Sequence, residues 1–193
     1  MERTGITEAI VDFANAVIGW VRGGLACTVE LAGMLMAGIS GSSNADASAL
    51  GAICLRALKK GGYEEGWAAA IVVSASGIGP IIPPSIIMIV YATAAGLDIG
   101  QLFTAGIVPG ICLGIAYMLV SVNYAKRHNI PKIPFKGFKH VWETFKKAIW
   151  ALLMPVIIIG GILYTGITNS DRSGSGLMAI LDACDAQLAL YWG

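Results

Sequence analysis

Two short segments, at 41–46 and 77–85, interrupt otherwise apolar sequence with residues that can hold a ligand. The first is Gly-Ser-Ser-Asn-Ala-Asp and the second is Gly-Ile-Gly-Pro-Ile-Ile-Pro-Pro-Ser. An interrupted helix in a bilayer leaves peptide groups unpaired, which costs several kcal/mol for each group unless the backbone lines a cavity or holds a ligand. Two such interruptions predict the ion and substrate site of a transporter. The alternative is a Pro-kinked helix and a polar loop packed against protein.

The first segment offers oxygen ligands for a cation. Ser42, Ser43 and Asn44 carry short side-chain oxygens, and hard cations such as Na⁺ prefer oxygen, by analogy with Ca²⁺ and Mg²⁺. A helix that ends at this depth adds free carbonyls, which suit a cation, and one that begins there adds free N–H groups, which suit a carboxylate. We therefore predict a Na⁺ site at Ser42, Ser43 and Asn44, with Gly77 contributed by the second segment.

The second segment has the residues that expose backbone. Gly77 and Gly79 let the chain approach a ligand closely, because they carry no side chain. Pro83 and Pro84 lack N–H donors and leave carbonyls one turn earlier unpaired. The segment is therefore expected to supply backbone oxygens opposite the first one.

Asp46 is a carboxylate near the predicted membrane depth, where an ionisable residue is by default a functional candidate. Two interpretations stay open. Asp46 could cap and shape the start of the helix that follows Asn44, or it could bind an ion or a proton directly.

Composition predicts an all-α, multi-pass membrane protein. The chain is 56% hydrophobic and 13% charged, against about 25% charged residues in soluble domains, and its mean hydropathy is +0.72. The net charge of +1 gives no electrostatic reason to expect a nucleic-acid partner. Paired carboxylates, a His/Cys cluster and a convincing nucleophile are all missing from the sequence, so we expect no enzyme activity and no cofactor.

Hydrophobic periodicity divides the chain into four regions. These are an interfacial amphipathic arm helix (1–22), a re-entrant hairpin plus a broken helix (23–95), two transmembrane helices joined by a basic cytoplasmic loop (96–166), and a divergent tail (167–193). The apolar stretches within them are 23–39, 45–58, 67–95, 102–124 and 148–166, with the loop at 125–147. In the tail, Leu177 to Trp192 can form one interfacial helix.

Length and charge favour the re-entrant hairpin over a single crossing. The stretch 45–58 is short for a hydrocarbon core of about 30 Å. If the chain returns to its starting side, all but Arg3 and Arg172 of the 13 lysines and arginines fall on one face, opposite the loop at 97–101. The positive-inside rule makes that face cytoplasmic.

Three motifs resemble the large membrane subunit of TRAP transporters, the tripartite ATP-independent periplasmic carriers. They are AGISGSSNADASALGAI (37–53), ASGIGPIIPPSIIMIVYA (75–92) and LFTAGIVPGI (102–111). The resemblance implies an elevator-type permease in the bacterial inner membrane, driven by a Na⁺ gradient. It also implies a small membrane subunit and a periplasmic substrate-binding protein as partners, and organic acids such as dicarboxylates as substrates.

The same resemblance implies where the site residues lie. Ser42, Ser43 and Asn44 would form the hairpin tip, and a second set would line the facing broken helix: Gly77, Gly79, Pro83 and Ser85. Family members are longer and contain an inverted repeat, whereas this sequence changes character after Thr168. The alternative function is therefore a truncated membrane fragment that transports nothing.

Overall fold

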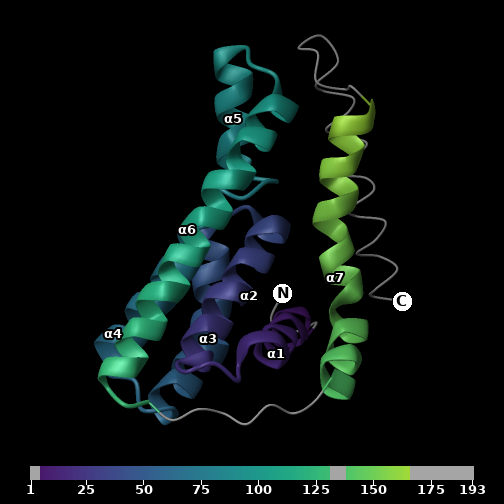
Figure 1. The fold of residues 1–193 in the computed structure, drawn as a ribbon. Coiled ribbons are helices and arrows are strands. Elements are labelled where there is room, and N and C mark those ends of the chain that lie inside the picture. Colours follow the sequence, from purple (N-terminus) through teal and green to yellow (C-terminus); the bar gives the residue numbers. More distant parts are fainter. Residues whose placement is uncertain (1–4, 131–137, 166–193) are drawn as a thin grey trace.

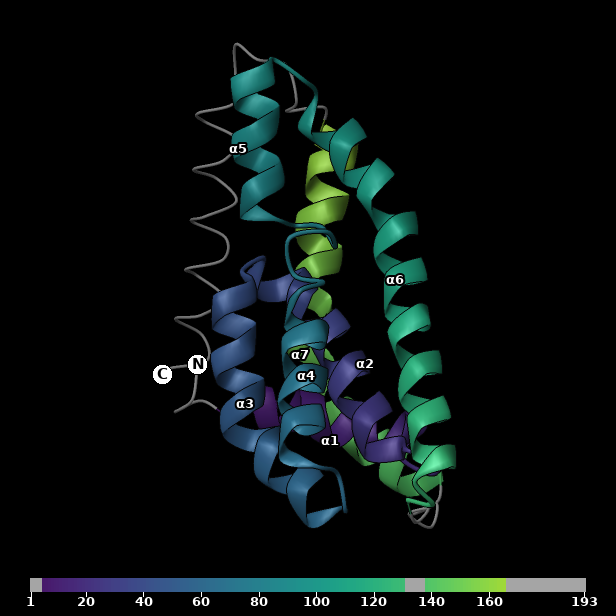
Figure 2. The same ribbon diagram turned by 90° about the vertical axis from the view of Figure 1, so that its left-hand side faces the viewer.

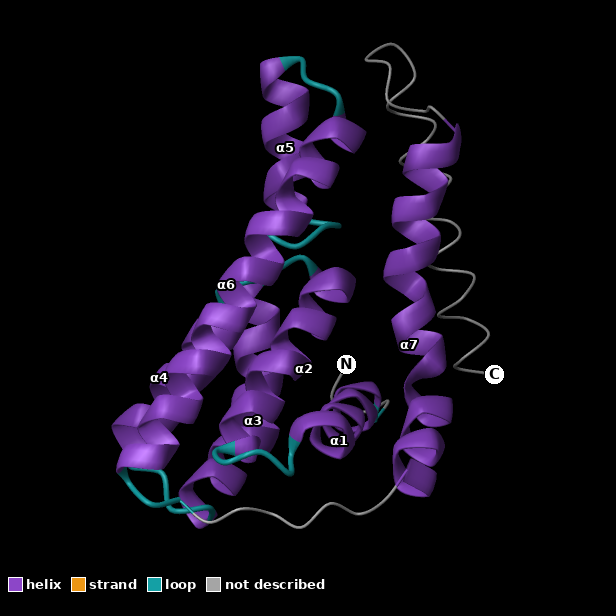
Figure 3. Cartoon of the chain, in the orientation of Figure 1, coloured by secondary structure: helices purple, strands orange, loops and turns teal. Residues whose placement is uncertain are grey.

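The computed structural model describes residues 5–130 and 138–165, and all regular structure within them is helical (Figure 3). The helices are α1 (Ile6–Ile18), α2 (Gly24–Ser40), α3 (Ser43–Lys60), α4 (Glu65–Ser76), α5 (Ile86–Ala95), α6 (Ile99–Arg127) and α7 (Phe138–Thr165). The predicted all-α class is confirmed for this part of the chain. The tail at 167–193 and its expected helix lie outside the described residues.

Helices α2 and α3 form an antiparallel hairpin with a two-residue turn (Figures 1 and 2). The turn is tight because Gly41 ends α2 in the left-handed region at φ 57° and Ser42 then returns to extended backbone. Helix α3 has 18 residues, about 27 Å at 1.5 Å per residue, so it is longer than the stretch 45–58 suggested. Helix α3 is not among the described helices that are long and apolar enough to cross a membrane, and the re-entry of the hairpin into a bilayer stays a prediction.

The predicted broken helix is present as α4 and α5, which are separated by residues 77–85. Turn-type bonds hold the first part of the break, with Ile78 O accepting from Ile81 N at 2.9 Å and from Ile82 N at 3.1 Å. The chain is extended at Ser85, where α5 begins. In Figure 2 this break lies at the height of the α2–α3 turn.

Helix α2 is the centre of the bundle and contacts α1, α3, α4, α6 and α7. The buried core collects around it, with Ile10 of α1, Leu50 of α3 and Ile71 of α4 among its members. Helix α6 is the one described helix that is long and apolar enough to cross a membrane by itself. Its surface carries large exposed apolar side chains, such as Val108 and Leu119.

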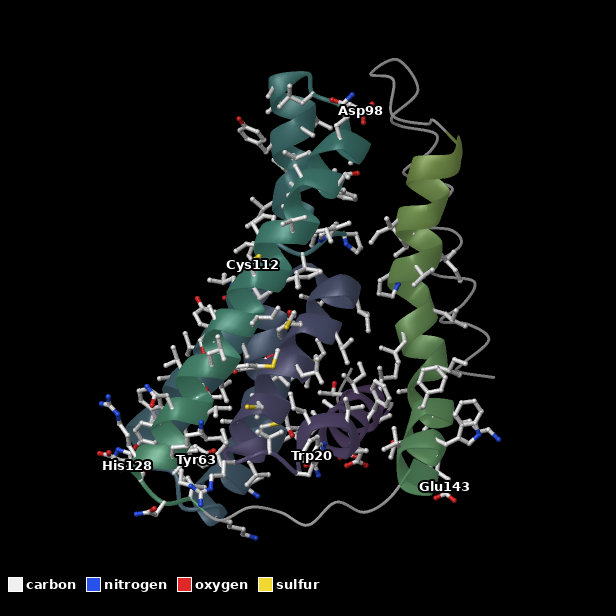
Figure 4. All side chains as sticks on the ribbon, viewed as in Figure 1. Trp20, Tyr63, Asp98, Cys112, His128 and Glu143 are labelled. Carbon is white, nitrogen blue, oxygen red and sulfur yellow. The ribbon has the colours of Figure 1, made fainter. Side chains whose placement is uncertain are left out.

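Charged residues collect at one end of the bundle. Figure 4 places Asp98 at one end and Tyr63 and His128 at the other. At the latter end the start of α2, the α3–α4 loop and the end of α6 converge, because a Cβ on Gly23 would lie 2.6 Å from the Cβ of Ala125 and 3.3 Å from the hydroxyl of Tyr63. The segments that meet there carry Arg22, Lys59, Lys60, Lys126 and Arg127. That this end is cytoplasmic stays a prediction.

The basic loop is shorter than predicted. Helix α6 continues to Arg127 and α7 begins at Phe138, so much of the expected loop 125–147 is helical. The many charges of this stretch made its amphipathic helical pattern hard to recognise in the sequence. In the structure Thr144 and Ala148 are buried, and the ring centroid of Phe145 lies 5.6 Å from that of Phe13 of α1.

Helix α1 runs across one end of the bundle and is seen nearly end-on in Figure 1. It packs on α2 and α7 through a face that includes Thr7, Ile10 and Ala14. An apolar face at helical spacing would include both Ile10 and Val17, but Val17 is 40% exposed. The helix is therefore present as predicted, but its buried face is rotated toward the small residues. Its interfacial position in a membrane stays a prediction.

Candidate functional site

The tip of the α2–α3 hairpin packs directly against the break between α4 and α5. A Cβ placed on Gly41 would lie 2.6 Å from the Pro84 carbonyl oxygen and 3.2 Å from the backbone N of Ile86. Only glycine therefore fits at position 41, because the backbone there has a positive φ and because the hairpin tip approaches the break so closely. The two segments singled out in the sequence form one junction.

Asp46 lies within this junction and is fully buried, at 0% exposure. Its Oδ1 accepts a hydrogen bond from Ser40 Oγ at 2.6 Å, and Ser40 Oγ accepts from the backbone N of Ser42 at 3.2 Å. Its Oδ2 has no hydrogen-bond partner among the described residues. A buried carboxylate with one oxygen unpaired is costly unless a proton or a cation satisfies it.

Asp46 does not cap α3. The N-cap position is occupied by Ser42, and Asp46 lies inside the first turn, where its own N–H donates to Ser42 O at 3.1 Å. The capping interpretation was therefore wrong. Instead, the carboxylate ties the end of α2 to the start of α3 through Ser40 and shapes the hairpin tip.

The break supplies the other wall around Asp46. A Cβ on Gly79 would lie 3.1 Å from Asp46 Oδ2, 3.2 Å from Ser76 O and 3.3 Å from the backbone N of Ser43. The unpaired oxygen therefore faces backbone of the break and of the α3 start. Because Gly79 has no side chain, the backbone of the break covers Oδ2 directly from that side.

Four helix ends meet near this carboxylate: the C-terminal ends of α2 and α4 and the N-terminal ends of α3 and α5. Helix C-termini present free carbonyls with partial negative charge, and N-termini present free N–H groups with partial positive charge. At the start of α5, Ser85 Oγ accepts from Met88 N at 3.4 Å. The junction therefore combines a carboxylate oxygen that has no partner among the described residues with the backbone of helix ends, which is chemistry suited to a small cation.

The structure brings most of the predicted site residues together. Ser42 and Ser43 form the tip, Gly79 covers Asp46, and Ser85 is buried with its Cα 3.2 Å from a Cβ on Gly41. The buried Pro83 directs its carbonyl toward the last turns of α2, 3.8 Å from a Cβ on Gly38.

Two predicted residues lie apart from this cluster. Asn44 is exposed, and so is Gly77, where a Cβ would meet only carbonyls of its own helix, those of Val73 and Ser74. Neither residue is placed beside the free oxygen of Asp46. Of the predicted Na⁺ ligands, Ser43 is the one whose backbone lies at the Gly79 turn.

Sequence reasoning missed two further residues of the junction. Ser40 holds Asp46 across the turn, and Pro155 of α7 lies 3.1 Å from a Cβ on Gly38. A serine one residue before the tip glycine was a visible signal for the first. The approach of α7 had none, because it depends on how distant helices pack.

The geometry can now be compared with known proteins. A family model described as "Tripartite ATP-independent periplasmic transporter, DctM component" matches residues 1–182. The chain belongs to this family. The resemblance expected from the three motifs is thereby confirmed.

Several relatives of this DctM-family chain are transporter permeases. One, 43% identical over 90% of this chain, is the C4-dicarboxylate TRAP transporter large permease protein DctM of Pseudomonas aeruginosa. Another, 40% identical over 91% of this chain, is the 2,3-diketo-L-gulonate TRAP transporter large permease protein YiaN of Escherichia coli. A third, 36% identical over 90% of this chain, is the sialic acid TRAP transporter permease protein SiaT of Haemophilus influenzae.

The matched region is one part of each relative. The chain spans 40%, 41% and 28% of the lengths of these three proteins. Their names describe permeases rather than enzymes, which agrees with the absence of enzyme activity expected from the sequence. Their names also describe different cargoes, so family membership alone does not fix a substrate.

Proposed function

We propose that this chain contributes the hairpin tip and broken helix of a Na⁺-coupled permease that takes up organic acids. The observation that carries the proposal is Asp46 Oδ2, a buried oxygen without a partner at the junction of two helix interruptions. Interrupted backbone at membrane depth is tolerated where it holds a ligand. A cation at this point would neutralise the carboxylate and use the free helix-end carbonyls.

Na⁺ suits the junction because its ligands would all be oxygens. Asp46 provides a charged oxygen, Ser42 and Ser43 provide hydroxyls, and the break provides carbonyls near Gly79 and Pro83. Hard cations favour such ligands, by analogy with Ca²⁺ and Mg²⁺. The residues around the site that would not coordinate the ion directly are then Asn44, Gly77 and Ser85.

The substrate class follows from the relatives. C4-dicarboxylates, sialic acid and 2,3-diketo-L-gulonate, named for three relatives, all carry a carboxylate group. A carboxylate is also the group that a free helix N-terminus binds best. We therefore propose an organic acid as substrate, dicarboxylate-like in the first instance.

The proposed setting is the bacterial inner membrane, with the chain crossing it several times. The partners would be a small membrane subunit, a periplasmic substrate-binding protein and the lipid bilayer, with no nucleic acid. The hairpin and α4 share one buried core, which supports their movement as one body in an elevator-type cycle. The alternative of a non-transporting fragment is not favoured, because the match to permeases runs through the junction itself.

Uptake in proteoliposomes tests the proposal. The chain is reconstituted with its two partner proteins, and entry of a labelled C4-dicarboxylate is measured with an inward Na⁺ gradient and with K⁺ in its place. We expect uptake with Na⁺ only. Uptake that is equal in the two salts, or no uptake in either, would contradict the proposed function.

A pair of serine variants sharpens the test. Ser43→Ala changes a residue at the junction, whereas Ser48→Ala changes an exposed serine one turn further along α3 whose hydroxyl bonds only Ala45 O. Losing one ligand of a buried polar group costs about 1–3 kcal/mol. We expect the Na⁺ concentration for half-maximal uptake to rise for Ser43→Ala and to stay unchanged for Ser48→Ala.

A further inference from the structure

A second buried carboxylate lies away from the junction, in the middle of α2. Glu30 is 1% exposed and faces α6, where Ser121 is 2% exposed. Ser121 Oγ donates a hydrogen bond to Glu30 Oε1 at 2.6 Å. Glu30 Oε2 has no hydrogen-bond partner among the described residues.

None of the lysines and arginines that the structure describes is buried beside Glu30. Wherever the structure describes the side chain, each lysine and arginine is exposed. The titratable groups that face Glu30 are Cys27 on its own helix and Tyr63 in the α3–α4 loop, with Tyr124 of α6 next to Tyr63. Burial raises the pKa of Tyr63 to about 12, so this phenol is neutral over the physiological range.

Apart from Asp46, which is buried at the hairpin tip, the charged groups that the structure describes on the remaining helices around α2 point outward. These exposed groups are Glu8 and Asp12 of α1, Arg56 of α3, Glu65 of α4, and Glu143, Lys146 and Lys147 of α7. An ionised Glu30 would therefore be an isolated charge in an apolar interior. Such a charge costs far more than an unpaired neutral oxygen does.

The backbone around Glu30 gives a metal cation too few ligands. Helices α2 and α6 both run without interruption past the Glu30–Ser121 contact, so their carbonyls are used within the helices. The side-chain oxygens left are the two of Glu30 and the hydroxyls of Ser121 and Tyr63, whereas hard cations take about six or more. A proton needs only one oxygen.

We propose that Glu30 is a proton-binding site, occupied as a neutral carboxylic acid that joins α2 to α6. The proton is carried by Oε2, while Oε1 accepts from Ser121. Because the ionised carboxylate is not tolerated in a dry interior, loss of the proton requires water to reach this contact. The Glu30–Ser121 contact is thus a pH-sensitive link between the hairpin and α6, independent of the Na⁺ site proposed above.

Nuclear magnetic resonance of the chain in lipid vesicles tests this directly. Glutamate is labelled with ¹³C at its side-chain carboxyl, which leaves Asp46 silent. The other glutamates whose side chains the structure describes, Glu8, Glu64, Glu65 and Glu143, are exposed, so their surroundings differ from those of the buried Glu30. We expect one protonated carboxyl signal near neutral pH in the wild type, and its loss as the pH rises.

Three variants assign the signal. It should be lost in Glu30→Gln, persist in Asp46→Asn, and persist at a shifted position in Ser121→Ala. If Glu30→Gln does not fold, the shift in Ser121→Ala still identifies the group. The proposal is overturned if every glutamate is ionised near neutral pH, if the protonated signal survives Glu30→Gln, or if it responds to Na⁺ at constant pH.

Discussion

Asp46 and Glu30 have nearly the same side-chain surroundings and very different backbone surroundings. Both are buried, at 0% and 1% exposure. Each accepts one serine hydroxyl at 2.6 Å, from Ser40 and Ser121 respectively. Each also keeps one oxygen without a partner. At the level of side chains, the two carboxylates look interchangeable.

The two carboxylates differ in the backbone that surrounds them. Asp46 lies where α2, α3, α4 and α5 end or begin, next to Gly79, whose lack of a side chain lets the backbone of the break approach the carboxylate closely. Glu30 lies between two continuous helices whose peptide groups are already paired. We propose that the first environment completes the coordination of a cation and that the second accepts only a proton. The comparison teaches that helix interruptions, rather than the carboxylate, decide which ion a buried acid can bind.

The largest effect on the free energy of unfolding is expected from adding a side chain at Gly41, where the hairpin tip packs against the break. Gly41 and Gly96 both end helices in the left-handed region, at φ 57° and 66°. A Cβ would meet the break at Gly41 and open space at Gly96. Left-handed strain costs about 1–2 kcal/mol for a non-glycine residue, and overpacking adds about 1–3 kcal/mol. Gly41→Ala should therefore lower the free energy of unfolding in mixed micelles more than Gly96→Ala; equal losses would mean that the tip does not pack on the break.

The second-largest effect on the free energy of unfolding is expected from removing the two serine hydroxyls that bond the buried carboxylates. Hydrogen bonds to charged groups contribute about 1.5–3 kcal/mol, and those between neutral groups about 0.5–1.5 kcal/mol. If Asp46 is ionised with its cation and Glu30 is neutral, Ser40→Ala in Na⁺ should cost more unfolding free energy than Ser121→Ala. The same unfolding assay measures both variants. A larger loss for Ser121→Ala would reverse the assignment of charge.

The smallest effect is the coupling between the two regions. Glu30 and Ser40 are separated by about 15 Å along α2, at about 1.5 Å per residue. Sites this far apart usually add within about 0.5 kcal/mol. The unfolding free energies of Asp46→Asn, Glu30→Gln and the double variant should therefore be additive within that limit. A larger interaction energy would mean that the two acids belong to one network.

Sequence reasoning located the interruptions more reliably than the contacts made across them. Gly41, Pro83 and Pro84 mark the breaks in the sequence itself, because glycine and proline act on the local backbone. The role of Asp46 was less accessible, since its partner Ser40 and its neighbour Gly79 are brought to it by the hairpin turn and by packing. The helical start of α7 could not be predicted for the same reason. The packing role of Phe145 depends on its contact with Phe13 of α1, which the local sequence does not reveal.

The contact between Glu30 and Ser121 could not be predicted from hydrophobic periodicity. A single carboxylate within the apolar stretch 23–39 was visible in the sequence, yet its partner Ser121 lies on a helix far along the chain. The spacing of residues within α2 cannot reveal such a contact. It depends on the tertiary approach of α2 and α6.

Equilibrium binding of radioactive Na⁺ to the reconstituted chain tests the central claim most directly. The wild type should bind Na⁺ saturably in a background of K⁺. Asp46→Asn should weaken binding by about 5- to 150-fold, equivalent to ~1–3 kcal/mol, while Glu30→Gln should leave the affinity within about twofold. Binding that survives Asp46→Asn unchanged, or that is lost in Glu30→Gln, would contradict the assignment of the cation to the interrupted helices.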